Sequence, residues 1–206
     1  MSLFLAFLVA AAILAFTPGP GVAYVVARTV AGGRSEGLAS CLGTALGGML
    51  HVLAAAFGLS AVLATSASAF SVVKYVGAAY LIYLGLRLLL RKQPVGLAVN
   101  APALGFRRAV HDGAVVEALN VKTAIFFLAF LPQFVAAGEP LVPQLLILGT
   151  ICVALNTGVD VLAVFGASRF LGSGVAKAAR EQLFTRASGV TMLGLGAFLA
   201  AAKRDA

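Results

Sequence analysis

The stretch that decides the fold is residues 3–30, LFLAFLVAAAILAFTPGPGVAYVVARTV. It is apolar over more than the roughly 20 residues that a helix needs to cross the hydrocarbon core of a bilayer. The run is interrupted halfway by Thr17-Pro18-Gly19-Pro20-Gly21. Its two prolines remove backbone donors, and its glycines permit an open backbone. We therefore expect a transmembrane helix that is broken in mid-membrane.

A break at this depth has a specific structural meaning. Irregular backbone persists within the hydrocarbon only where it is buried in protein or lines a wet cavity. The half-helix that restarts near Gly21 would direct free N–H groups and the positive end of its dipole at that cavity, which suits a carboxylate. A packing kink is the alternative interpretation, but two prolines with flanking glycines are more than a kink requires.

The composition of the whole chain indicates that its main solvent is lipid. Of its 206 residues, 61% are hydrophobic and 11% are charged, with a mean hydropathy of +1.03. A soluble domain carries about 25% charged residues. The net charge of +8 would suit nucleic acid, but the basic residues lie at the ends of apolar runs and no aromatic stacking platform accompanies them. We expect no nucleic-acid partner.

The sequence carries no pattern that is typical of an enzyme. It lacks a phosphate-binding loop, a serine elbow and an HExxH motif. Its only histidines are His51 and His111, which leaves few ligands for a metal. We therefore expect no catalysis, no cofactor and no metal site.

Six apolar runs are each close to the length of a membrane span. They cover residues 3–30, 38–64, 70–90, 113–136, 141–168 and 183–202. None shows the alternating pattern of a membrane β-barrel strand. The predicted fold is therefore an all-α integral membrane protein, with six transmembrane helices in the single domain 1–206.

Basic residues predict the orientation of these spans. Eleven of the fifteen Lys and Arg residues lie around the connectors that follow spans one, three and five. Lys74, Lys203 and Arg204 lie on the opposite side. Because Lys and Arg collect in cytoplasmic loops, we expect both termini to be extracytoplasmic.

The chain divides into halves of three spans each, residues 1–103 and 104–206. With an odd number of spans per half, the second half is inserted upside down relative to the first, as in inverted-repeat transporters. The break in span one has a counterpart in span four, the polar run Asn120-Val121-Lys122. We therefore expect two inverted three-helix repeats, with helix one broken and a second break in helix four.

Ionisable and amide side chains inside the spans are the next candidates for a transport site, because each is costly in hydrocarbon. Lys122 of span four and Asp160 of span five lie at a similar depth, and Asn120 and Asn156 lie close to them. We expect Lys122 and Asp160 to pair, either permanently or until a substrate or a proton passes. His51 of span two is a candidate proton carrier or a packing residue, since imidazole titrates near neutral pH.

Two further features allow alternative interpretations. Glu117 lies one turn inside span four, where we expect its side chain to reach the membrane interface. The run Gly43-Thr44-Ala45-Leu46-Gly47 presents a small-residue face. Such a face serves either packing within the monomer or a homodimer contact.

Together these residues resemble the LysE/RhtB family of amino-acid exporters of bacterial cytoplasmic membranes, over nearly the whole chain. The first span of that family carries Thr-Pro-Gly-Pro-Asn, of which Thr17-Pro18-Gly19-Pro20 is present and Gly21 replaces the Asn. Its fourth span carries Asn-Pro-Lys, then aromatics and Pro-Gln-Phe. The corresponding runs here are Asn120-Val121-Lys122, Phe126-Phe127 and Pro132-Gln133-Phe134.

Asp160 occupies the place of the family's acidic residue in span five, and residues 76–85, VGAAYLIYLG, are similar to its third span. The resemblance implies export of an amino acid or a close derivative, driven by the proton gradient; the inverted halves predict alternating access. Gly21 in place of Asn and Val121 in place of Pro leave the identity of the substrate open. Val121 also restores a backbone donor, so we expect span four to be less broken than in relatives. The residues that we expect along the substrate path are Thr17, Pro18, Gly19, Pro20, Gly21, His51, Asn120, Lys122, Asn156 and Asp160.

Two other functions stay open. Cys41 and Cys152 lie in spans two and five, which are equivalent under the predicted repeat, so a membrane thiol–disulfide conduit would need their sulfurs adjacent and reactive. An exporter of a metal ion or another small solute would use the same scaffold, but no span presents a cluster of His, Asp and Glu ligands.

Overall fold

The computed structural model describes residues 3–59, 67–90, 102–136, 138–170 and 175–201. Within these residues every regular element is a helix, as the apolar runs predict. In chain order the elements are α1 (Leu3–Phe16), α2 (Pro20–Leu53), the π-helix η1 (Ala54–Leu59), α4 (Ala67–Leu89), α5 (Phe106–Ala118), α6 (Val121–Ile125), the π-helix η2 (Phe126–Phe130), the 3-10 helix η3 (Leu131–Phe134), α7 (Leu141–Phe170) and α8 (Val175–Ala201).

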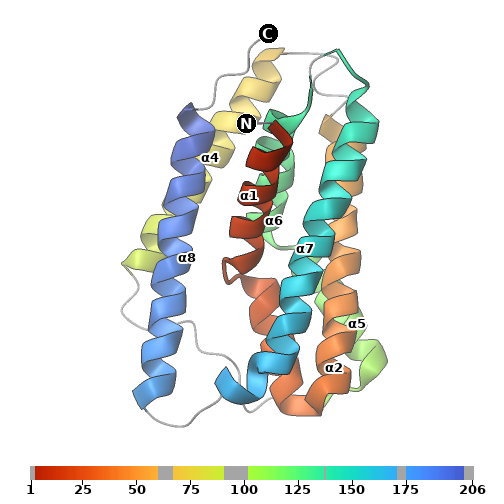
Figure 1. The fold of residues 1–206 in the computed structure, drawn as a ribbon, viewed down its shortest axis with the longest axis vertical. Coiled ribbons are helices and arrows are strands. Elements are labelled where there is room, and N and C mark those ends of the chain that lie inside the picture. Colours follow the sequence, from red (N-terminus) through yellow and green to blue (C-terminus); the bar gives the residue numbers. More distant parts are fainter. Residues whose placement is uncertain (1–2, 60–66, 91–101, 137, 171–174, 202–206) are drawn as a thin grey trace.

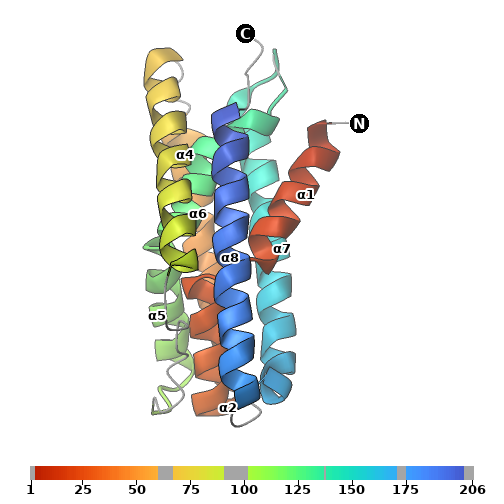
Figure 2. The ribbon, with the colours of Figure 1, turned by 90° about the vertical axis from the view of Figure 1, so that its left-hand side faces the viewer.

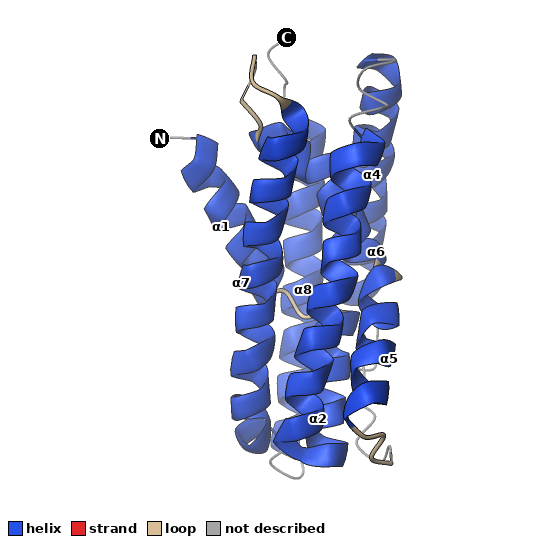
Figure 3. Cartoon of the chain, turned by 90° about the vertical axis from the view of Figure 1, so that its right-hand side faces the viewer, coloured by secondary structure: helices blue, strands red, loops and turns tan. Residues whose placement is uncertain are grey.

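The helices form one elongated bundle along which the chain runs back and forth (Figure 1). α2 reverses direction at Gly33, whose φ of 77° lies in the left-handed region that favours glycine. Its first arm continues the path of α1, and its second arm returns along the bundle. The start of α1 and the end of α8 lie toward the same end of the molecule (Figure 2). Most described loops lie at the two ends of the bundle, but a short loop also interrupts the helices halfway along (Figure 3).

By length and composition, three segments of the described chain can each cross a membrane: Pro20–Gly58, Ser71–Leu89 and Leu141–Ala167. A fourth forms if Phe106–Ala118 and Val121–Phe134, which meet at 48°, count as one bent span. The described chain therefore fits an all-α membrane protein. The division into six spans and two inverted repeats stays a prediction, and the span ends expected at residues 64 and 202 lie outside the described residues.

The main core is built around the phenylalanines of η2 and η3. Phe126, Phe127 and Phe130 are at most 1% exposed. The rings of Phe126 and Phe130 stack with 5.1 Å between centroids, and Phe7 of α1 meets Phe134 edge-on at 5.8 Å. Aromatic pairs of this kind add about 0.5–1.5 kcal/mol each to the apolar area that they bury. This core fixes α1 against η3, the end of the bent pair formed by Phe106–Ala118 and Val121–Phe134.

Large apolar side chains also cover the outside of the bundle. Residues that are at least half exposed include Val9, Phe16, Leu50, Val72, Leu162 and Phe198. A soluble monomer rarely exposes contiguous apolar patches larger than a few hundred Å². An apolar outer surface around a core that also contains polar groups is the arrangement that lipid requires.

Glycines bring the second arm of α2 into backbone contact with α5. A Cβ atom added to Gly43 would overlap the carbonyl oxygen of Val110, and one added to Gly47 would lie 2.5 Å from the carbonyl oxygen of Ala114. Both glycines are buried. Of the two interpretations of this small-residue face, the structure therefore shows packing within the chain.

Substituting Gly43 with alanine is expected to lower the stability of the protein by about 1–3 kcal/mol, the usual cost of overpacking a tight core. Thermal unfolding of the purified protein in detergent measures the change. Gly158 of α7 is the matched control, because a Cβ atom there would have no neighbour within 4 Å. Alanine at position 158 should leave the melting temperature unchanged or raise it, since alanine favours a helix by about 1 kcal/mol over glycine. Equal melting temperatures for the two variants would contradict the packing described here.

A buried charge cluster ties the turn of α2 to the start of α5. Arg28 and Glu36 are each 4% exposed, and Arg28 Nη1 lies 3.8 Å from Glu36 Oε2. The other oxygen of Glu36 accepts hydrogen bonds from the backbone N–H groups of Leu104 and Gly105, at 2.7 and 2.6 Å. Arg28 also donates to the carbonyl of Pro102 at 2.9 Å. Arg28 is thus an interior ion-pair residue and not a loop cation.

Candidate functional site

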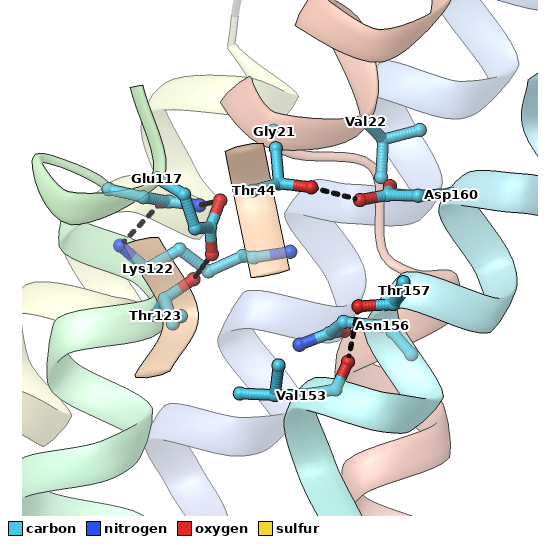
Figure 4. A pocket seen from close by; sticks show the side chains of 13 residues that line it. Gly21, Val22, Thr44, Glu117, Lys122, Thr123, Val153, Asn156, Thr157 and Asp160 are labelled. Atoms are coloured by element: carbon cyan, nitrogen blue, oxygen red, sulfur yellow. Dashed lines mark hydrogen bonds between the residues drawn. The ribbon is translucent and has the colours of Figure 1, made fainter. Parts of the chain in front are cut away.

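Two interruptions of the helices adjoin one cavity in the middle of the bundle. α1 ends at Phe16 and α2 begins at Pro20, whereas α5 ends at Ala118 and α6 begins at Val121. The cavity has an empty volume of about 440 Å³, part of which is open to the surroundings. Its polar lining comes from α2, the α5–α6 region and α7, as Figure 4 shows. The polar residues are Thr44, Glu117, Asn120, Lys122, Thr123, Asn156, Thr157 and Asp160.

The break between α1 and α2 has the form that its prolines predict. Gly19 precedes α2 with extended backbone, Pro20 occupies the first turn, and no side chain caps this helix N-terminus. Thr17 turns its hydroxyl back to the carbonyl of Ile13, at 2.6 Å. Gly21 lines the cavity, whereas residues 17–20 form the adjoining break.

Lys122 joins the two breaks. Its ammonium donates to the carbonyl of Thr17 at 2.8 Å and to that of Leu14 at 3.4 Å. These carbonyls belong to the C-terminal end of α1, where a cation is favoured by the helix dipole. A Cβ atom on Gly19 would lie only 2.9 Å from Lys122 Nζ, so glycine leaves room for this bond.

The expected ion pair between Lys122 and Asp160 is not formed. Asp160 instead accepts a hydrogen bond from the Thr44 hydroxyl, at 2.9 Å (Figure 4). Both charged residues line the same cavity, and Asp160 is 5% exposed. The similar depth of the two residues was therefore sufficient to bring them to one site but not into contact.

Glu117 belongs to this site, contrary to the expectation that it reaches the membrane interface. It is 8% exposed, and its two carboxylate oxygens accept hydrogen bonds from Asn120 Nδ2 at 3.0 Å and from the Thr123 hydroxyl at 2.6 Å. α5 begins at Phe106, two turns before the apolar run suggests, so Glu117 lies much deeper than one turn.

Asn120 organises the second break. Its Oδ1 accepts a hydrogen bond from the backbone N–H of Lys122 at 3.1 Å and so caps the N-terminus of α6. Val121 does have the backbone donor that proline would lack, but the two helices still meet at 48°. The cap explains how a break forms without proline, and the expectation that span four is less broken than in relatives stays a prediction.

Two predicted site residues make weaker contributions to the cavity. Asn156 lines it, with its amide nitrogen 3.9 Å from Cys152 Sγ. His51 is not among the lining residues, but its Nε2 lies 2.9 Å from the carbonyl oxygen of Glu117. Since a carbonyl oxygen only accepts, Nε2 is the donor in this bond.

Sequence reasoning missed the hydroxyl groups of the site. Thr44, Thr123 and Thr157 all line the cavity. Threonine is common in membrane helices, where its hydroxyl usually bonds to the preceding turn, as Thr157 does to the carbonyl of Val153 at 2.8 Å. The signal in the sequence that could have found these threonines is that they lie at a similar depth in the spans as Lys122 and Asp160.

The cavity offers both signs of charge to a small solute. Among the described residues that line it, Lys122 is the one cation and Glu117 and Asp160 are the carboxylates. Amide and hydroxyl groups lie between them. Such a set can match a molecule that carries an ammonium group and a carboxylate at once.

The structure gives no support to a thiol–disulfide conduit. Cys41 and Cys152 are free and buried. Cys152 packs in the main core, whereas Cys41 packs in a separate cluster with Val25 and Val164. Within the described residues no group of three or more His, Cys, Asp or Glu side chains is placed to hold a metal ion.

Comparison with known proteins finds similar sequences over most of the chain. The family model described as LysE type translocator matches residues 12–203. An uncharacterised membrane protein of Vibrio cholerae is 27% identical, with 97% of both chains covered. A homoserine/homoserine lactone efflux protein of Salmonella typhimurium is 29% identical, with 96% of both chains covered, and an uncharacterised membrane protein of Bacillus subtilis is 31% identical over 73% of this chain and 76% of its own. No solved structure matches the chain.

Proposed function

Because this chain belongs to the LysE type translocator family, we propose that it is a secondary transporter that exports an amino acid or a close derivative across the bacterial cytoplasmic membrane. The cavity at the two helix breaks is the observation that carries this proposal. It is lined by buried or half-buried groups of both charges, which persist in a membrane protein chiefly along substrate and ion paths. The efflux proteins of Salmonella, named for homoserine and its lactone, support this substrate class.

In this proposal the chain makes six passes, arranged as two inverted halves of three. The reversal of α2 at Gly33 supports two passes in place of one, and the bent pair of α5 and α6 supports another broken pass. The first broken pass then consists of α1 and the first arm of α2. Alternating access would move the two halves about the cavity. Both termini would lie outside the cell, and protons would move inward as substrate leaves.

Each predicted site residue has a role in this mechanism. The ammonium of Lys122 attracts the substrate carboxylate, and Gly21 keeps the start of α2 free of a side chain at the cavity. Asp160 exchanges a proton, and His51 is a second candidate for proton transfer. Asn120 and Asn156 supply neutral hydrogen bonds, and Thr17 to Pro20 hold the backbone open.

Transport by purified protein in proteoliposomes tests the proposal. We expect homoserine, homoserine lactone or at least one of the twenty common amino acids to move across the membrane. The flux should increase when a proton gradient drives protons in the direction opposite to the substrate. The same vesicles assayed with divalent cations should show no cation flux. A variant with both Cys41 and Cys152 changed to serine should show unchanged amino-acid flux. Vesicles that carry cations but none of these amino compounds would contradict the proposal.

A further inference from the structure

Glu117 places its carboxylate against the first turn of α2, where residue 21 has no side chain. A Cβ atom on Gly21 would lie 2.5 Å from Glu117 Oε2 and 3.6 Å from its Cδ. Gly21 is not one of the glycines with positive φ, which are Gly33, Gly105 and Gly138. The backbone conformation therefore does not require glycine here, and the space for a Cβ atom is taken by the Glu117 carboxylate.

The Glu117 carboxylate is held in position with binding capacity left over. Asn120 and Thr123 each donate one hydrogen bond, one to each oxygen. An ionised carboxylate has about four acceptor positions, so roughly two stay open. Both donors come from the α5–α6 region, which fixes the carboxylate to the rim of the cavity that it lines.

No cationic side chain in the described part of the chain lies within salt-bridge distance of this carboxylate. Lys122, two residues after Asn120, sends its ammonium to the carbonyls of Thr17 and Leu14 instead. Lys122 and Glu117 line the same cavity and interact only at longer range, so the carboxylate has no direct ion pair among the described residues. A cationic group that enters the cavity from outside would therefore gain charge-assisted hydrogen bonds at little cost in reorganisation.

We propose that Glu117 binds the ammonium group of the transported solute and that Gly21 leaves open the space its carboxylate occupies. This inference rests on the proposed function and sharpens it, because it requires the substrate to carry a free amine. Lys122 then binds the carboxylate or lactone carbonyl and Glu117 the ammonium of one small molecule, so the substrate class is an α-amino acid or an amino lactone.

Glu117→Gln tests the proposal because it removes the charge and keeps the shape. The probes are homoserine and N-acetylhomoserine, which lacks the ammonium, in calorimetric titrations of detergent-purified protein. We expect the wild type to bind homoserine more tightly than N-acetylhomoserine. Glu117→Gln should bind homoserine roughly 10- to 100-fold more weakly than the wild type does, which corresponds to the loss of one or two charged hydrogen bonds. The preference for homoserine should then disappear. Asp112→Asn is the matched control, because this half-buried carboxylate on the same helix pairs with His111 and Arg108 outside the cavity.

Several outcomes would overturn the inference. One is that Glu117→Gln binds both probes as the wild type does. Another is that it binds both probes equally more weakly, which would indicate a purely structural role. If it keeps its preference for homoserine but loses the dependence of flux on an imposed pH gradient, the carboxylate carries a proton and not the amine. Transport of amino acids by the wild type in any of these cases leaves the proposed function standing, whereas no transport by the wild type removes both.

A double substitution tests the role of Gly21 separately. Gly21→Ala should weaken homoserine binding about as much as Glu117→Gln, because the new methyl group displaces the carboxylate. In a Glu117→Ala background the same change should cost less than about twofold, since contacting residues give non-additive effects. Additive effects of the two substitutions would overturn the assignment of this space, and melting curves of all four proteins identify any variant that fails to fold.

Discussion

Lys122→Met is expected to reduce amino-acid transport by at least about 100-fold. The substitution keeps the length of the side chain but removes an ammonium that donates to the carbonyls of Thr17 and Leu14. Hydrogen bonds to charged groups contribute about 1.5–3 kcal/mol each, and each 1.4 kcal/mol is a factor of ten. The end of α1 would lose its cation, and the cavity would lose the one cation that lines it within the described residues.

The initial rate of homoserine counterflow in proteoliposomes measures this loss. Arg108→Met is the matched control, because Arg108 is a basic residue near the start of α5 whose side chain is 70% exposed. It should keep nearly the full rate. A rate above half of wild type for Lys122→Met would show that Lys122 is not part of the transport site. A melting curve separates loss of transport from loss of fold.

Asp160→Asn is expected to uncouple transport from the proton gradient. Asparagine can still accept the hydrogen bond from Thr44 through its Oδ1, so the local structure is retained. What disappears is a carboxylate that can gain and lose a proton. One proton moved through a gradient of one pH unit contributes about 1.4 kcal/mol, which corresponds to a tenfold change in accumulation.

The measurement is the steady-state accumulation of homoserine at two imposed pH gradients. For the wild-type protein, homoserine accumulation should change about tenfold per pH unit for each coupled proton. Asp160→Asn should give the same accumulation at both gradients. Asp112→Asn serves again as the control and should behave as wild type. An unchanged response of Asp160→Asn would assign the coupling proton to another group, with His51 as the next residue to test.

The break in the first helix could be predicted from the sequence because proline and glycine act locally. Pro18 and Pro20 lack N–H groups wherever they stand, so the interruption between Phe16 and Pro20 follows from residue type alone. The break after Ala118 was harder to judge. It depends on the side chain of Asn120 reaching the N–H of Lys122, and a side-chain cap is only one of several conformations open to an asparagine.

The contacts of the site could not be predicted, because depth along a helix does not give direction around it. Lys122 and Asp160 were placed at one level correctly enough to share a cavity, yet each faces another partner. Glu117 was misplaced for a different reason. The polar residues Arg107, Arg108, His111 and Asp112 hide the first two turns of α5, whose start at Phe106 is preceded by Gly105 with a φ of 80°.

The backbone contact between the second arm of α2 and α5 has a consequence for how the protein changes shape. Where Gly43 and Gly47 touch the carbonyls of Val110 and Ala114, no flexible side chain separates the two helices, so sliding one past the other would force main-chain atoms together. Because these two helices belong to opposite predicted halves, the halves can rock about this contact in the proposed mechanism but cannot slide past each other there.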